Sequence, residues 1–222
     1  MRELEIRNYP FEHMVVDNFL SLKLFKKLIA ELKQMDLSYD SVNGDFRCIS
    51  RISKTGKEEF ADGLSTNLLS EIFAENNDFL LDKLARLSGK KLPLYDFTEL
   101  RIQKAETAYA SGAHTDSAKK LLSVVIYLHP EKEEGTQLYE TKRGLIVAEC
   151  EWQQNRAFIF ARKENKTWHS WASKGDKGRF VLVYTLMTNK PEAALANEGW
   201  MSQFYAVRKN VMAMIASPFK RS

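Results

Sequence analysis

The 222-residue sequence has few cysteines, few histidines and little net charge. Its two cysteines, Cys48 and Cys150, are more typical of buried thiols in a reducing compartment than of a disulfide-stabilised scaffold. The formal net charge is +4, and a surplus this small does not favour a protein that binds nucleic acids or other polyanions. We therefore expect no nucleic-acid partner.

Long hydrophobic runs are also absent. No apolar segment approaches the ~20 residues that a membrane-spanning helix needs. The first residues, MRELEIRNYPFEHM, include acids where a signal peptide would carry a positive patch and then an apolar run. We therefore expect a cytoplasmic protein with no membrane partner. Without a repeat, a low-complexity stretch or a linker, residues 1–222 are expected to form one domain of unknown oligomeric state.

The segment before about residue 91 has helical periodicity, which predicts a helical layer. Between Ser21, a candidate cap, and residue 35, apolar side chains recur at steps of three and four: Leu24, Phe25, Leu28, Ile29, Leu32 and Met35. A second helix is expected from Ser65 or Thr66 to Gly89, with a break at Asn76-Asn77. Between the two helices, Asn43-Gly44 predicts a tight hairpin turn.

From about residue 92 to 189 the pattern changes to short strand-like segments separated by turns. These segments are Thr98–Ala108, Leu121–Leu128, Gln137–Glu140, Leu145–Glu149, Ala157–Ala161, Thr167–Ala172 and Phe180–Met187. Strands at this spacing predict a mainly β core of about eight strands, as a sandwich or barrel. After Pro191 a C-terminal helix is expected over about 190–217, with Phe204, Val207, Val211 and Ile215 on one side.

Three residues form a candidate metal site. His114 and Asp116 are two residues apart, so in an extended backbone both side chains point the same way. His169 lies in a later predicted strand and can complete a set of two imidazoles and one carboxylate. Such a set is the facial triad of non-haem iron(II) oxygenases. The His-x-Asp pair taken alone is also explained by a hydrogen-bonded loop pair.

Arg179 opens the last predicted strand, whose remaining residues are almost wholly apolar. A buried guanidinium needs a partner, and its planar fork suits a carboxylate. That carboxylate belongs either to a ligand or to a neighbour such as Asp176 or Glu149.

Residues 100–187 resemble the Fe(II)/2-oxoglutarate-dependent oxygenase superfamily, in its prolyl-4-hydroxylase-like branch. Four runs carry the resemblance, in the matching order and spacing: HTDSAKKLLSVVIYLHP, EEGTQLYE, QNRAFIFA and TWHSWASKGDKGRFVLVYTL. The helix in DNFLSLKLFKKLIAEL is similar to the family's N-terminal lead-in. Two positions depart from the pattern, because Arg179 stands where collagen-type members use lysine and Ala105 where many members have tyrosine.

The resemblance implies a double-stranded β-helix, or jelly roll, with flanking helices. It also implies a dioxygenase that hydroxylates its substrate with O2 and the cosubstrate 2-oxoglutarate and releases succinate and CO2. Fe(II) would be held by His114, Asp116 and His169, and the far carboxylate of 2-oxoglutarate by Arg179. Tyr127 matches a tyrosine that binds the same carboxylate, and Leu138 matches a residue that packs on the cosubstrate.

Other functions stay open at this point. A cupin-like module that binds a metal or ligand without turnover is the main alternative, although cupins usually carry His-x-His rather than His-x-Asp. A nucleic-acid demethylase is disfavoured, because Thr185 stands where that branch has a second arginine. Tyr127 is equally explained as a core residue, and Lys119-Lys120 is expected to be a solvated turn. The substrate is left as an amino acid, a sugar, another small molecule or a protein side chain.

Overall fold

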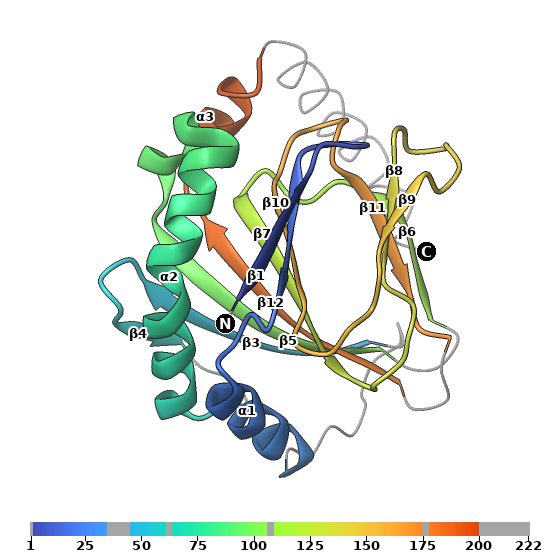
Figure 1. Cartoon of the computed structure of the whole chain (residues 1–222). Helices are drawn as coiled ribbons and strands as arrows, with labels where there is room; N and C mark the ends of the chain where they lie inside the picture. The colour runs from blue at the N-terminus through green and yellow to red at the C-terminus, as the bar shows by residue number, and fades with distance from the viewer. Residues whose placement is uncertain (1, 35–44, 61–63, 106–108, 175–177, 200–222) are drawn as a thin grey trace, which may run out of the picture.

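The computed structural model describes residues 2–34, 45–60, 64–105, 109–174 and 178–199. Two antiparallel sheets face each other, and the helices cover the outer face of the larger sheet (Figure 1). The larger sheet has eight strands in the order β1-β2-β10-β7-β12-β5-β3-β4, and the smaller has four in the order β6-β11-β8-β9. This arrangement confirms the predicted jelly-roll core with flanking helices.

The core from residue 92 to 189 contains eight strands among its described residues, as predicted. They are β5 (Phe97–Ala105), β6 (Ala110–His114), β7 (Lys120–His129), β8 (Thr136–Tyr139), β9 (Ala148–Cys150), β10 (Ala157–Ala161), β11 (Trp168–Ala172) and β12 (Arg179–Met187). The sequence did not predict β6, because Ala110–His114 lacks the β-branched and aromatic residues that favour strands. Pairing with β11 holds this segment extended instead.

The N-terminal region was expected to be a helical layer, but it also contains strands. Besides α1 (Leu22–Gln34) and α2 (Thr66–Ser88), it contains β1 (Glu3–Arg7), β2 (His13–Asp17), β3 (Asp45–Ser53) and β4 (Glu58–Phe60). β1 and β2 extend the larger sheet beyond β10, whereas β3 and β4 extend it beyond β5. β1, β2 and β4 have only three to five residues, and β3, which has nine, is held in the sheet by pairing with β5. The predicted turn at Asn43-Gly44 lies outside the described residues.

The expected break in α2 at Asn76-Asn77 is not present. Both side chains are buried, and each makes a hydrogen bond that is compatible with a continuous helix. Asn76 donates from Nδ2 to the Ile72 carbonyl at 2.7 Å, and Asn77 Oδ1 accepts from Thr98 Oγ1 at 3.0 Å. Ser65 caps the first turn as predicted, and α2 ends at Ser88, where a 3-10 helix, η1 (Gly89–Leu94), follows.

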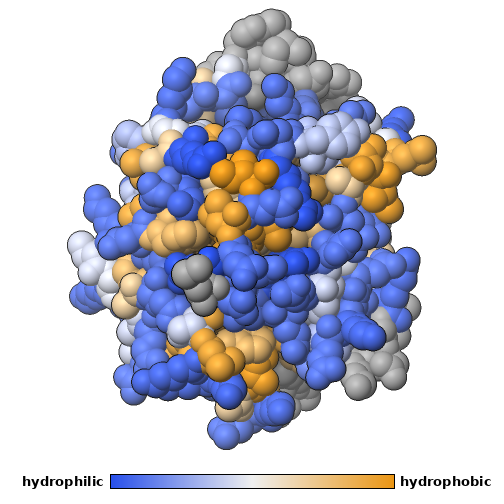
Figure 2. All heavy atoms as spheres, viewed as in Figure 1, coloured by the Kyte–Doolittle hydropathy of each residue, from blue (hydrophilic) through white to orange (hydrophobic). Residues whose placement is uncertain are grey.

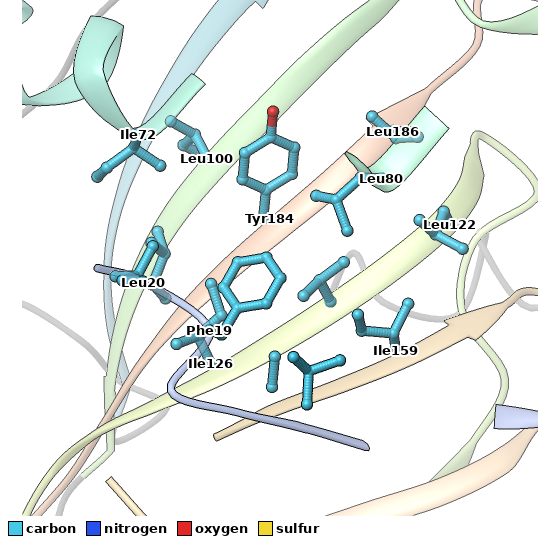
Figure 3. Close-up of a cluster of buried hydrophobic side chains, with 14 of the residues drawn as sticks. Phe19, Leu20, Ile72, Leu80, Leu100, Leu122, Ile126, Ile159, Tyr184 and Leu186 are labelled. Atoms are coloured by element: carbon cyan, nitrogen blue, oxygen red, sulfur yellow. The ribbon is translucent and has the colours of Figure 1, made fainter. Parts of the chain in front are cut away.

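A hydrophobic core fills the space between the helices and the larger sheet. Figure 3 shows Ile72 and Leu80 of α2 against strand residues that include Leu100 of β5 and Tyr184 of β12, and these four are at most 1% exposed. Burying a side chain of this size contributes about 1.5–3 kcal/mol. Because strand side chains alternate, the residues next to Leu100 and Tyr184 face the smaller sheet. This inner face carries the candidate site.

The last described helix is α3 (Pro191–Ala196), which ends earlier than predicted because residues 197–199 are not helical, and the predicted helix from residue 200 on lies outside the described residues. Cys150 is a free, buried thiol, and burial raises its pKa to about 11. None of the helices in the described ranges is both long and apolar enough to cross a bilayer. The face in Figure 2 is mostly hydrophilic, with hydrophobic groups in separate patches.

Candidate metal centre

The fold brings the three predicted ligands together at one end of the smaller sheet. His114, the last residue of β6, is the cross-strand partner of His169 in β11, and their ring centroids are 4.5 Å apart. Asp116 follows β6 by two residues. One candidate ligand atom from each side chain lies within 4.8 Å of the others, which is close enough for a single ion.

Both imidazoles are oriented by a backbone carbonyl. His114 Nδ1 lies 2.9 Å from the Gly112 carbonyl oxygen, and His169 Nδ1 lies 3.0 Å from that of Thr167. Because a carbonyl only accepts, each Nδ1 carries the proton and each Nε2 keeps a free lone pair. This is the tautomer that binds metal through Nε2.

Asp116 is held as a carboxylate by two side chains of β7. Lys120 Nζ donates to Oδ1 at 2.7 Å, and Ser123 Oγ donates to Oδ2 at 2.5 Å. Burial alone would raise the pKa of Asp116, but the positive charge of Lys120, together with His169 and these hydrogen bonds, holds it well below the ordinary value. The expectation that Lys120 belongs to a solvated turn is wrong, because it forms an ion pair with Asp116.

His169, in contrast to the charged Asp116, is neutral because it is buried. Burial lowers its pKa to about 4, and the attraction of Asp116 only partly opposes that shift. At neutral pH the site therefore offers a neutral imidazole beside a carboxylate. These are the protonation states that metal binding requires.

The backbone of Asp116 is also fixed. Arg162, which is 1% exposed, donates from Nε to the Asp116 carbonyl oxygen at 3.1 Å. The other side of its guanidinium donates from Nη1 to both carboxylate oxygens of Glu198, at 2.8 and 2.9 Å. Glu198, which follows α3, is thus linked to the metal site through the buried Arg162.

Arg179 is the second buried arginine, and it has no such carboxylate among the described residues. It is 2% exposed, and neither Nε nor Nη2 has a hydrogen-bond partner in the described ranges. The rings of Tyr127, Trp152 and Trp171 surround its guanidinium carbon, with centroids 4.9–5.7 Å away. Burial lowers the pKa of Arg179 to about 10, so it remains a cation at neutral pH.

Of the two expected protein partners of Arg179, the one that the structure describes, Glu149, bonds elsewhere. The Glu149 carboxylate instead accepts from the Gly135 backbone nitrogen at 2.8 Å, and Asp176 lies outside the described residues. The turn that positions Arg179 depends on Gly178, which has a φ of +70° and lies against the Ala105 carbonyl.

One narrow cavity joins the triad to Arg179. Its volume is about 70 Å³, and its walls include all three candidate ligands, Arg179 and Thr136. One water molecule needs about 10–15 Å³ of cavity volume, so this cavity suits a small, slender molecule rather than a ring system. The triad and the cation therefore face the same small compartment.

Tyr127 and Leu138 lie behind this compartment rather than on its wall. The Tyr127 hydroxyl is 2.8 Å from Thr136 Oγ1 and 3.0 Å from the Cys150 carbonyl oxygen, and it accepts from the Thr136 backbone nitrogen. Leu138 is fully buried and is the cross-strand partner of His169. Their roles at the cosubstrate stay predictions, and Thr136, which the sequence did not single out, is the hydroxyl residue on the cavity wall.

Comparisons with known proteins give a structural likeness only. No protein-family profile and no curated protein matches the sequence. Among solved structures, a Pseudomonas putida prolyl-4-hydroxylase has a TM-score of 0.52 and 15% identity over 79% of this protein and 91% of its own length. The dioxygenase for auxin oxidation 1 from Arabidopsis thaliana, solved with 2-oxoglutarate, has a TM-score of 0.57 and 13% identity over 77% and 80%.

A third similar structure is IDO from Bacillus thuringiensis, with a TM-score of 0.59 and 10% identity over 80% of this protein and 90% of its own length. At these identities the likeness establishes the fold alone, which is a double-stranded β-helix. Within that fold lies the triad of the His-x-Asp pair and the distal histidine.

Proposed function

We propose that the protein is an Fe(II)- and 2-oxoglutarate-dependent dioxygenase that hydroxylates a small molecule or a protein side chain. One observation carries the proposal: the triad of His114, Asp116 and His169 shares a narrow cavity with Arg179, a buried cation that lacks a carboxylate among the described residues. A site for a metal and a site for a carboxylate thus line the same cavity, as the binding of one small diacid to both would require.

The residues present fit both groups. Nε2 of each histidine and a carboxylate oxygen of Asp116 would hold Fe(II) on one face, which leaves positions open for 2-oxoglutarate and O2. Arg179 would receive the far carboxylate through Nε and Nη2, the two nitrogens without a partner in the described residues. Bound there, the iron supplies oxygen activation.

The reaction balances without a further reductant. Substrate C–H, O2 and 2-oxoglutarate give substrate C–OH, succinate and CO2. One oxygen atom enters the new hydroxyl group and the other enters succinate, while the bond between carbons 1 and 2 of 2-oxoglutarate breaks. We propose that this takes place in the cytoplasm, without a nucleic-acid partner.

Metal and cosubstrate binding test the proposal directly. Iron-loaded wild-type protein kept without oxygen should develop a metal-to-ligand absorption band on titration with 2-oxoglutarate, and should release succinate in air. His114→Ala and His169→Ala should lose both signals, whereas His129→Ala, a histidine away from the cavity, should keep them. A protein that binds iron but never consumes 2-oxoglutarate would instead be the cupin-like alternative.

A further inference from the structure

Two pairs of stacked aromatic rings meet at the guanidinium group of Arg179. They are Tyr109 with Trp171, whose ring centroids are 5.1 Å apart, and Tyr127 with Trp152, whose centroids are 4.5 Å apart. The guanidinium carbon lies over three of these rings, 4.9 Å from the centroid of Trp171, 5.2 Å from that of Trp152 and 5.7 Å from that of Tyr127. At these distances a cation is attracted to the face of a ring. The rings therefore hold a charge whose Nε and Nη2 have no hydrogen-bond partner among the described residues.

Holding an arginine by rings differs from holding it by hydrogen bonds. Arg162, the other buried arginine of the described residues, donates from Nε to the Asp116 carbonyl oxygen and from Nη1 to Glu198, so these N–H groups are already used. Attraction to a ring face uses the charge of the guanidinium and none of its N–H groups. The rings around Arg179 thus restrain the side chain and leave its Nε–Nη2 edge available to a carboxylate.

Trp152 contacts Arg179 from outside the cavity. Trp171 lines the cavity wall together with Arg179, whereas Trp152 is not among the described residues that line it. Trp152 follows β9, and its partly buried side chain packs against the hydrophobic cluster that contains Tyr127. A ligand in the cavity would touch Arg179 and Trp171 directly. An effect of Trp152 on that ligand would therefore pass through the residues that Trp152 holds.

The Trp152 ring is itself fixed by its neighbours. Its Nε1 donates to the Pro130 carbonyl oxygen at 2.8 Å, and its plane is 18° from that of the Tyr127 ring. The Tyr127 hydroxyl lies 3.0 Å from the Cys150 carbonyl oxygen, so the second ring of the pair is anchored as well. A ring that is held on two sides can serve as a fixed support for the flexible side chain of Arg179.

A restrained arginine binds a carboxylate more tightly than a free one. The arginine side chain has several rotatable bonds, and a side chain that is already ordered loses less conformational entropy on binding. A bidentate contact also requires the edge of the guanidinium to be directed at the ligand. Resting on the proposed function, we propose that Trp152 is a positioning residue. It holds Arg179 with Nε and Nη2 directed at the far carboxylate of 2-oxoglutarate, and it thereby sets the affinity for that cosubstrate.

The test compares two ligands that differ only at the end that Arg179 would bind. Iron-loaded protein kept without oxygen is titrated with 2-oxoglutarate and with 2-oxopentanoate, in which a methyl group replaces the far carboxylate. Both ligands offer the same 2-oxo acid to the metal, so the metal-to-ligand absorption band reports the binding of each. Trp152→Leu should weaken 2-oxoglutarate about 10-fold, through the loss of a desolvated contact between cation and ring, and should leave 2-oxopentanoate within about twofold of wild type.

Further variants show whether Trp152 acts through Arg179. Trp152→Phe keeps a ring beside the guanidinium and should recover most of the lost affinity. In an Arg179→Lys protein, Trp152→Leu should cost less than about threefold more, because lysine has no planar fork to orient. Phe79→Leu is the matched control and should bind both ligands as wild type does. It removes a ring centred 4.8 Å from the guanidinium carbon of Arg2, and Phe79 does not line the cavity. Circular dichroism verifies folding, and Trp152→Met is used if Trp152→Leu is unfolded.

The outcomes separate the two proposals. If wild type binds 2-oxoglutarate and the Trp152 variants bind it equally well, the positioning role is wrong and the proposed function stands. The positioning role is also overturned if Trp152→Leu weakens both ligands to the same extent, or costs as much beside Arg179→Lys as it does alone, since Trp152 would then support the site as a whole. If wild type neither binds nor consumes 2-oxoglutarate, both proposals fall.

Discussion

Glu198→Gln is the single substitution from which we expect the largest loss of stability. Glu198 has a 2% exposed side chain and neutralises two buried cations, Lys91 and Arg162. It also accepts from the Glu164 backbone nitrogen at 2.7 Å. Lys91 is fully buried, and burial is the main reason that its pKa is lowered, with Glu198 opposing the shift.

The magnitude follows from what the substitution leaves behind. Removing one partner of a buried ion pair typically costs about 3–5 kcal/mol, because the remaining charge is buried without compensation. Arg162 keeps its ion pair with Glu164, so Lys91 is the cation that would lose its carboxylate partner. With roughly 2–4 °C of melting temperature per kcal/mol in a protein of this size, we expect a fall of about 10 °C.

The assay is thermal and urea unfolding of metal-free protein, followed by circular dichroism. The control is Glu71→Gln, which breaks an ion pair with Lys27 whose side chains are 43% and 46% exposed and should cost only about 1 kcal/mol. Without Glu198, the folded state binds a proton on Lys91 less readily than the unfolded state. The deficit should therefore shrink as pH rises towards the pKa of Lys91 in the folded wild type, because wild type then loses the same proton and with it the ion pair to Glu198.

Two results would refute this reasoning. One is a Glu198→Gln protein that melts within about 2 °C of wild type, since a buried pair should be worth far more than a surface pair. The other concerns the metal. Because Arg162 also bonds the Asp116 carbonyl, Glu198→Gln should weaken Fe(II) binding about 10-fold, as outer-shell substitutions commonly do. Unchanged iron affinity would remove this link.

Three further predictions concern the cavity and its surroundings. Arg179→Ala should weaken 2-oxoglutarate roughly 30-fold to several thousand-fold in the anaerobic absorption titration, with Fe(II) affinity nearly unchanged and Arg179→Lys intermediate. Metal-free protein should lose stability in urea as pH falls from about 6.5 to 4, since burial lowers the pKa of His169 to about 4 and the unfolded state takes up that proton first. Gly135→Ala should lower the melting temperature by several degrees, because its Cβ would lie 1.9 Å from the Cys150 carbonyl oxygen; an unchanged melting temperature would show that β9 moves aside freely.

The triad was predictable because its geometry is largely local. His114 and Asp116 are joined by one residue, and an extended backbone alone makes their side chains parallel. His169 needed only to lie on a neighbouring strand, and its predicted strand matches β11 within one residue. Strand segments with β-branched and aromatic residues were found for the same reason, because each carries its own signal.

What the sequence did not predict depends on contacts between distant residues. β6 has no strand-forming composition, and its extended form comes from pairing with β11, about sixty residues later. Lys120 appeared to be a surface lysine until the fold placed Asp116 against it. The partners of Asn77, which keep α2 unbroken, come from β5 and β12. No local pattern encodes such pairs.

The contrast between the two buried arginines explains why the fold favours a ligand at one and not at the other. Arg162 and Arg179 are 1% and 2% exposed, so each would destabilise the fold by several kcal/mol without a partner. The protein supplies Arg162 with two carboxylates and a carbonyl oxygen, and it commits that arginine to supporting Asp116. Around Arg179 it places three aromatic rings and, among the described residues, no hydrogen-bonded carboxylate, and rings attract a cation more weakly than such a carboxylate does. A diacid bound to the metal would remove this deficit, so part of its binding free energy would come from relieving an unfavourable burial that the fold maintains.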